Sequence, residues 1–389
     1  MHKISPNPIV PKRGIKQESE VLFLLSRFEP AASVLEKAQA LIPAVHWDSF
    51  VSLAAGHGVS GLVYKNLLKM KNVPEEWLAR FRNTYQSTLR DNVLLATETD
   101  RLFDLLTFRG IEVIPLKGTV TAELIFGDIG LYPSGDIDIL VPMKEISMVK
   151  EILAAEGYHL KDSGFDEYKD FYIQQLYHIS LSSSRFTVEP HWNLFMRYFT
   201  APPEFWWEES VSVFLGGRRY RFLSPERNIL YTSFRNFYKG FTPLRFLVLT
   251  AAIIRHYKDE IDWEKLFGYA GTFHFENVLR VNLKLCKDFL DAPVPLQYAC
   301  IKGQRIKILY RLITKMVLSA NDIHPLHKAG LLLLRDDLKG ISRILLRRLF
   351  PPMGEIVSRY RLTPGTGKAV AYYAFNPMLL LLKKHRDRT

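Results

Sequence analysis

The stretch 135-GDIDILV-141 places two aspartates inside an otherwise apolar run. Ile, Leu and Val favour β-structure, and Gly135 and Pro142 punctuate the ends, so the stretch predicts a short buried strand. Side chains alternate along a strand, so Asp136 and Asp138 point to the same face, with backbones roughly 7 Å apart. Two carboxylates at this spacing resist ionising together unless a cation lies between them. The stretch therefore predicts a divalent metal site.

A third acid follows in the stretch 186-FTVEPHW-192. Alternation along this predicted strand places Thr187, Glu189 and His191 on one face. If the two strands are neighbours, Glu189 joins the aspartates, and a three-carboxylate cluster suits Mg²⁺, which takes oxygen ligands in octahedral geometry. His191 shares the face of Glu189, and His178 lies upstream. Histidines in such settings are more often packed and hydrogen-bonded than ligands.

The stretch 115-PLKG-118 leads from a predicted strand, 112-EVIPL-116, through a glycine turn into a predicted helix, 119-TVTAELIF-126. Amide groups at a turn and helix start bind phosphate, because they have no intrahelical partner and the helix dipole favours an anion. Lys117 adds a cation for a triphosphate, although its position also fits a plain exposed lysine. Gly118 supplies the turn.

The bulk composition indicates a globular protein with a large core. The chain has 389 residues, of which 48% are hydrophobic. The longest apolar run, Phe246 to Ile254, is far shorter than the roughly 20 residues of a membrane-spanning helix. The first residues lack the apolar stretch of a secretory signal. Two cysteines form neither a disulfide framework nor a metal-ligand pattern, so we expect a cytoplasmic protein.

The positive charge is concentrated at one end of the chain. Of 52 basic and 40 acidic residues, residues 301–389 hold 18 and 5. This excess predicts an anionic partner there, such as nucleic acid, an anionic membrane or a polyphosphate. Lys339, Arg343 and Arg347 recur every fourth residue, a pattern that a merely solvated helix face also shows.

The order of predicted elements indicates an α+β protein with a compact core between two helical regions. A helical stripe of Leu95, Thr99, Leu102 and Leu106 ends at Gly110, which suits a left-handed helix cap. We expect four regions. They are a flexible tail over 1–18, an N-terminal helical region over 19–98, an α/β core over 99–224 and a C-terminal helical region over 225–389, basic after residue 300.

The order of the motifs resembles the DNA polymerase beta type nucleotidyltransferase superfamily. More closely, PLKG, GDIDILV, VEPHW and 262-DWEKLFGYAG-271 are similar to a family of uncharacterised bacterial nucleotidyltransferases, over about residues 40 to 290. The resemblance implies the polymerase beta type fold, with a small mixed sheet and helices.

The resemblance also implies transfer of a nucleoside monophosphate from an NTP, such as ATP, to a hydroxyl acceptor, with two Mg²⁺ ions as cofactors. By this resemblance the metal ligands and catalytic residues are Asp136, Asp138 and Glu189. The nucleotide-binding loop is Lys117, Gly118 and Gly135.

Two positions depart from the family pattern. Tyr132 stands where an arginine usually lies four residues before the first aspartate, and an aspartate is common near Leu249. The departures leave a second reading open, a nucleotide-binding protein of the same fold with impaired catalysis. A third is a metal-dependent glycosyltransferase, since those enzymes also use an Asp-x-Asp pair. The acceptor is open among small molecules, sugars, peptides and RNA.

Overall fold

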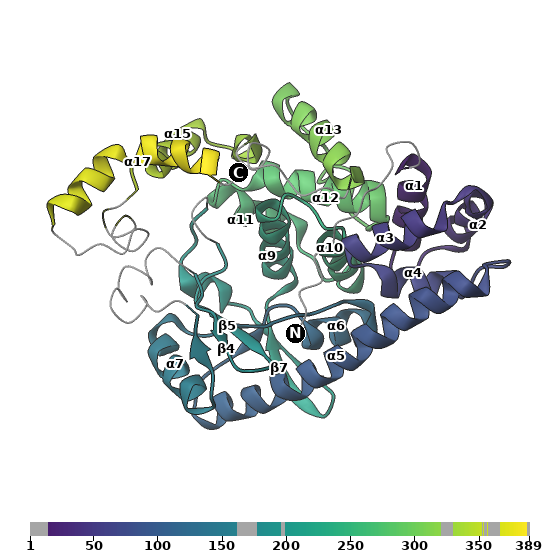
Figure 1. The fold of residues 1–389 in the computed structure, drawn as a ribbon, viewed down its shortest axis with the longest axis horizontal. Coiled ribbons are helices and arrows are strands. Elements are labelled where there is room, and N and C mark those ends of the chain that lie inside the picture. Colours follow the sequence, from purple (N-terminus) through teal and green to yellow (C-terminus); the bar gives the residue numbers. More distant parts are fainter. Residues whose placement is uncertain are drawn as a thin grey trace.

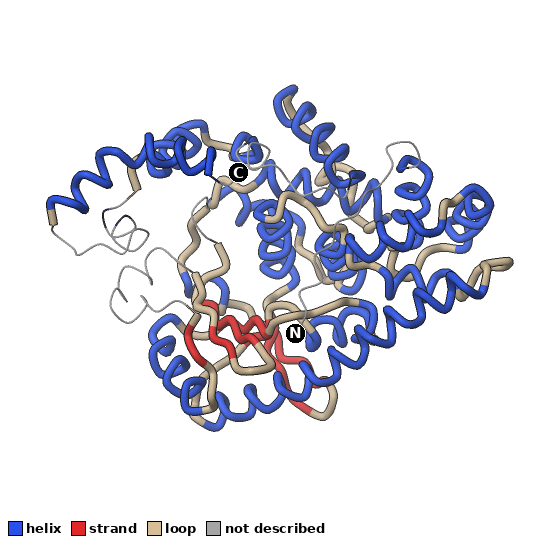
Figure 2. The backbone as a smooth tube through the Cα atoms, viewed as in Figure 1, coloured by secondary structure: helices blue, strands red, loops and turns tan. Residues whose placement is uncertain are grey.

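The computed structural model describes residues 15–161, 177–195, 199–319, 330–351, 353, 356 and 366–386. Helices surround a small mixed sheet near one edge of the molecule (Figures 1 and 2). The predicted α+β class, with a small mixed sheet between helical regions, is confirmed. Residues 1–14 of the predicted tail lie outside the described residues, and helix α1 begins at Ile15.

The main sheet has five strands in the order β1-β2-β5-β4-β3. Their bounds are Ile114–Pro115 (β1), Ile137–Leu140 (β2), His159–Leu160 (β3), Leu181–Ser182 (β4) and Thr187–His191 (β5). Strands β2 and β5 run parallel to each other, and the other neighbouring pairs are antiparallel. The strands predicted from the two acidic stretches are therefore direct neighbours.

The two faces of β2 pack against different hydrophobic clusters. Ile137 and Ile139 belong to a cluster with the long helix α5 (Glu75–Phe108), whereas Leu140 belongs to a larger cluster that includes helices of both helical regions. Asp138 alternates with the isoleucines, so its side chain lies on the face of Leu140, toward the C-terminal helices. This alternation directs the acids away from α5.

Helix α5 carries the predicted stripe. Leu95, Thr99, Leu102 and Leu106 are all buried, and Thr99 satisfies its hydroxyl by donating to the Leu95 carbonyl at 2.7 Å. The chain leaves the helix through Gly110, which has a left-handed φ of 76°. The predicted boundary at residue 98 falls inside this single continuous helix.

The remaining elements complete the two helical regions and the core. The N-terminal helices are α1 (Ile15–Leu25), α2 (Ala32–Leu41), α3 (Trp47–His57) and α4 (Ser60–Leu67). The core adds α6 (Thr119–Phe126), α7 (Ile146–Ala155) and a hairpin of β6 (Val211–Leu215) and β7 (Arg218–Phe222). Then come α9 (Pro225–Tyr238), α10 (Arg245–His256), α11 (Trp263–Thr272) and α12 (Glu276–Leu290). Short 3₁₀ turns cover Ile42–Ala44, Ile129–Leu131, Met143–Glu145, Pro203–Trp206 and Leu332–Leu334.

The N-terminal helices hold both the loop before β2 and the start of α10. The Asn92 side-chain amide donates to the carbonyls of Ile129 and Tyr132 at 2.6 and 2.8 Å. His57, at the end of α3, accepts a hydrogen bond from the Leu244 amide at 3.0 Å. Residues far apart in the chain thus fix the backbone on both sides of the aspartates.

The basic end of the chain is helical in its described parts. It contains α13 (Gln304–Ser319), α15 (Leu338–Leu349) and α17 (Gly367–Arg386). Lys339 is exposed and Ile341 is buried, as an amphipathic α15 requires, while the side chains of Arg343 and Arg347 lie outside the described residues. Across the described ranges, no helix is long and apolar enough to cross a bilayer. Both cysteines are free.

Candidate active site

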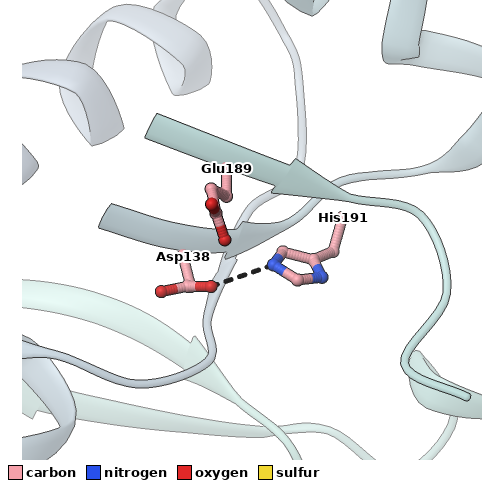
Figure 3. A group of neighbouring side chains, drawn as sticks. All are labelled: Asp138, Glu189 and His191. Atoms are coloured by element: carbon pink, nitrogen blue, oxygen red, sulfur yellow. Dashed lines mark hydrogen bonds and ion pairs between the residues drawn. The ribbon is translucent and has the colours of Figure 1, made fainter. Parts of the chain in front are cut away.

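The candidate site is built on the parallel pair β2 and β5. Their register sets Asp138 directly opposite Glu189, so both carboxylates leave the same face of the sheet. Asp136 lies immediately before β2, two residues earlier on the same side. In Figure 3 the side chains of Asp138, Glu189 and His191 point toward one another. The structure thus brings Glu189 beside Asp138, whereas Asp136 pairs with Lys117 and is not in the group of described residues whose ligand atoms lie within 4.8 Å of one another.

Asp138 is the most deeply buried acid of the group. It is 2% exposed, and it contacts His191, whose Nε2 lies 3.0 Å from Oδ1, and the ammonium of Lys117. Burial alone would raise the pKa of Asp138, but the charge of Lys117 and the hydrogen bond to His191 outweigh it and hold the pKa well below its usual range. Asp138 is therefore a carboxylate at neutral pH.

Lys117 lies between the two aspartates. Its Nζ is 2.7 Å from Asp136 Oδ1 and also contacts Asp138 Oδ2. Burial would lower the pKa of Lys117, but Asp138 and Asp136 raise it above its ordinary value, so the side chain keeps its charge. The cation that the Asp-x-Asp spacing requires is an ammonium in this structure. Lys117 is therefore not the plain exposed lysine that its position in the sequence also allowed.

Glu189 lacks such compensation. It is half-buried, its Oε2 lies 3.9 Å from Nε2 of His178, and the charge of Lys117 acts on it without outweighing burial. Burial and the charges of Asp138 and Asp136 raise the pKa of Glu189 to about 7. Burial lowers the pKa of His178 to about 3 and also lowers that of His191, so both imidazoles are neutral. The site thus carries more carboxylate than cation near Glu189.

The donor set fits a divalent metal ion. Asp138, Glu189 and His191 each offer one ligand atom, and these atoms lie within 4.8 Å of one another. Two carboxylates and a neutral imidazole are ordinary ligands for a divalent ion. His191 and His178 also stack, with ring centroids 4.8 Å apart. On the sequence alone, both histidines ranked below the acids as site residues. The signal for His191 was its position two residues after Glu189, which places both side chains on the same face of the strand.

A pocket beside the aspartates, which we call the α9–α10 pocket, contains the predicted phosphate loop. It has a volume of about 260 Å³ and is open to solvent. Lys117, Gly118, Gly135 and Asp136 line it, and Gly118 has a left-handed φ of 94° just before α6. The loop and the aspartates therefore share one pocket.

Comparison with known proteins identifies the family. The family model described as uncharacterised nucleotidyltransferase matches residues 43–291. The chain belongs to this nucleotidyltransferase family. No curated protein and no solved structure matches the chain, so the polymerase beta type fold and the bacterial affiliation stay predictions. The matched range contains the pocket, the sheet and both acidic strands.

The two departures of this nucleotidyltransferase from the family pattern are buried. Tyr132 is 4% exposed and stacks on Phe126, with ring centroids 6.1 Å apart, while it also lines the α9–α10 pocket. Leu249 is 1% exposed, in the core of α10. Both side chains contribute packing rather than charge.

Sequence reasoning missed two cations of the nucleotidyltransferase site. Arg235, from α9, and Arg245, from the start of α10, line the pocket across from the loop. They lie in the region predicted to be outside the core, and no local motif marks them. Only the packing of α9 and α10 over the sheet brings them to the aspartates.

Proposed function

We propose that this protein is a metal-dependent nucleotidyltransferase that transfers a nucleoside monophosphate from an NTP to a hydroxyl group of an acceptor. The observation that carries the proposal is the register of β2 and β5, which sets Asp138 opposite Glu189. Membership of a nucleotidyltransferase family supports it. Asp136, Asp138 and Glu189 are the proposed metal ligands and catalytic residues, for two Mg²⁺ ions.

The roles follow from the chemistry of phosphoryl transfer. Asp136, Asp138 and Glu189 would hold the divalent ions, which would lower the pKa of the attacking hydroxyl and neutralise charge on the leaving pyrophosphate. Lys117, Gly118 and Gly135 bind the triphosphate in the α9–α10 pocket. The hydroxyl oxygen of the acceptor bonds to the α-phosphorus, pyrophosphate leaves, and a carboxylate of the cluster accepts the hydroxyl proton.

The test is a labelling assay with the purified protein. Each α-labelled NTP is incubated with Mg²⁺ and a whole-cell extract, and the labelled species is identified. We expect the double variant Asp136→Asn, Asp138→Asn to lose transfer, because amides bind divalent ions far more weakly than carboxylates. Asp91→Asn, an exposed aspartate of α5, is the matched control. Full transfer by a folded double variant would reject the mechanism.

One observation favours the second function, a nucleotide-binding protein with impaired catalysis. The Lys117 ammonium contacts both aspartates, where metal ions have to bind for catalysis. Calorimetry with ATP, CTP, GTP and UTP in Mg²⁺ separates the two functions. Binding without turnover across many acceptors supports the binding protein, whereas transfer from any NTP rejects it.

A further inference from the structure

The α9–α10 pocket holds two arginines that form no ion pair with any residue that the structure describes, although Asp138 and Asp136 act on Arg235 as more distant charges. Within the described ranges, the guanidinium groups of Arg235 and Arg245 form no hydrogen bond or ion pair with another side chain, and Arg245 Nε is buried without a partner. Both residues are only half-exposed. Partly buried cations of this kind are costly unless an opposite charge binds beside them.

The arginines are held in place by packing instead of by acids. Their guanidinium carbons lie 4.9 and 5.0 Å from the ring centroid of Phe246, and Arg235 also lies 5.9 Å from the ring of Tyr231. These ring contacts fix the side chains while leaving their N–H groups free to donate. The cations are therefore positioned before any ligand binds.

Contacts of α9 with α10 and α12, and of Arg245 with the end of α3, restrain the two arginines further. Asn236, which follows Arg235, donates to Thr250 Oγ1 and Asn282 Oδ1 at 3.0 and 2.7 Å, so α9 is fixed to α10 and α12. At Gly58 a Cβ atom would lie 2.7 Å from Arg245 Cδ. The N-terminal helices thus leave room for the stem of Arg245 by placing a glycine there.

The charges of the pocket suit a chain of phosphates. Lys117, Arg235, Arg245 and Asp136 all line the pocket, but Lys117 is already paired with Asp136 and Asp138, so the two arginines are the pocket cations that lack an ion pair in the described parts of the chain. Guanidinium groups bind phosphate oxygens through paired N–H donors. A monoanion cannot neutralise both arginines.

We propose that Arg235 and Arg245 bind the polyphosphate chain of the donor nucleotide, across the pocket from Lys117 and Gly118. This inference rests on the proposed function and deepens it, because it makes α9 and α10 part of the donor site. It also assigns a specificity: the pocket selects nucleoside triphosphates over monophosphates and nucleosides.

Calorimetry with inorganic tripolyphosphate and with ATP plus Mg²⁺ tests the proposal on the full chain. We expect Arg235→Met and Arg245→Met each to weaken both ligands by about tenfold or more, the usual effect of losing charged hydrogen bonds. Arg219→Met, an exposed arginine of β7, removes the same charge elsewhere and should change the affinity less than about twofold. Arg235→Lys keeps the charge without the paired N–H donors, so it should bind both ligands with intermediate affinity. It replaces Arg235→Met in the test if the methionine variant does not fold.

The outcomes separate the two proposals. Loss of tripolyphosphate binding in the arginine variants supports the pocket even if the wild-type protein transfers nothing. Transfer by the wild type, with unchanged binding in both folded arginine variants, overturns the pocket while the proposed function stands. Equal affinity of the wild type for tripolyphosphate and orthophosphate, or no binding of tripolyphosphate, also overturns it.

Discussion

At the scale of single residues, the site depends on which cation lies between the aspartates. The Lys117 ammonium contacts both carboxylates, and the Asp138 side chain is almost fully buried. An ammonium there compensates the two acids, and under the proposed function a divalent ion would have to displace it. Lys117 is therefore placed to stabilise the fold and to compete with metal binding.

The variant Lys117→Met tests this competition. Because it leaves buried Asp138 without its cation, we expect the free energy of unfolding without metal to fall by about 3 kcal/mol. Added Mn²⁺ should restore much of this loss and should bind more tightly than to the wild type. Urea unfolding and calorimetry measure the two effects. Lys144→Met, whose side chain is exposed, is the control, and equal stability of both variants would contradict the expectation.

His191 allows a second test at this scale. An imidazole among carboxylates favours Mn²⁺ over Mg²⁺ relative to an all-oxygen site. We expect His191→Gln to weaken Mn²⁺ binding more than Mg²⁺ binding, measured by the electron paramagnetic resonance of free Mn²⁺ and by Mg²⁺ competition. If His191 only orients Asp138 through its 3.0 Å hydrogen bond, both ions will weaken equally. His159→Gln, on exposed β3, controls for the substitution.

At the scale of elements, alternation in the strands made the acidic cluster predictable. The pairs Asp136 and Asp138, and Glu189 and His191, each share a face because strand side chains repeat every two residues. The order of the strands in the sheet was harder to predict. Proline cannot donate to a sheet ladder and usually lies at an edge or a bulge, yet Pro190 lies in β5, which is an inner strand. Regular pairing of β4 with β5 covers only Thr187 and Val188, and beyond it the Pro190 carbonyl accepts a hydrogen bond from the Ile179 amide at 3.2 Å.

The contact between α3 and α10 predicts how stability depends on pH. Burial lowers the pKa of His57 to about 4, from an ordinary value of 6.5, so the unfolded chain binds its proton more tightly than the folded chain does. Stability should therefore fall as the pH drops from 6.5 to 4, by roughly 3 kcal/mol for this group.

Urea unfolding across this pH range checks the expectation. His57→Asn offers an acceptor to the Leu244 amide but does not titrate, so its stability should depend less on pH than that of the wild type. His159→Asn, on exposed β3, should keep the wild-type dependence. Parallel curves for the wild type and His57→Asn would show that His57 does not carry the effect.

At the scale of the whole molecule, the helical regions and the core share packing. One hydrophobic cluster includes Phe50 and Phe81 from the N-terminal region, Leu140 from β2 and Phe234 from α9. The regions predicted from the order of elements are therefore not separated by a break in the described core, and α5 crosses the predicted boundary at residue 98. The anionic partner of residues 301–389 stays a prediction.

Truncation tests this shared packing. A chain of residues 99–389 lacks residues 75–98, the greater part of α5, and all of α1 to α4, which exposes the larger cluster to water. We expect it to lose native near-ultraviolet circular dichroism and cooperative unfolding. The intact chain under the same conditions is the reference. Cooperative unfolding of the truncated chain at the same urea midpoint would show that the N-terminal helices are independent.

The sequence alone determined the α+β class, the two acidic strands and the family, because strand alternation, helical stripes and glycine turns are local signals. Only the tertiary structure decided that Lys117 lies between the aspartates, that His191 contacts Asp138 and that Arg235 and Arg245 line the pocket. These contacts join segments up to roughly a hundred residues apart. They arise from how helices pack over the sheet, and no periodicity within one segment encodes that packing.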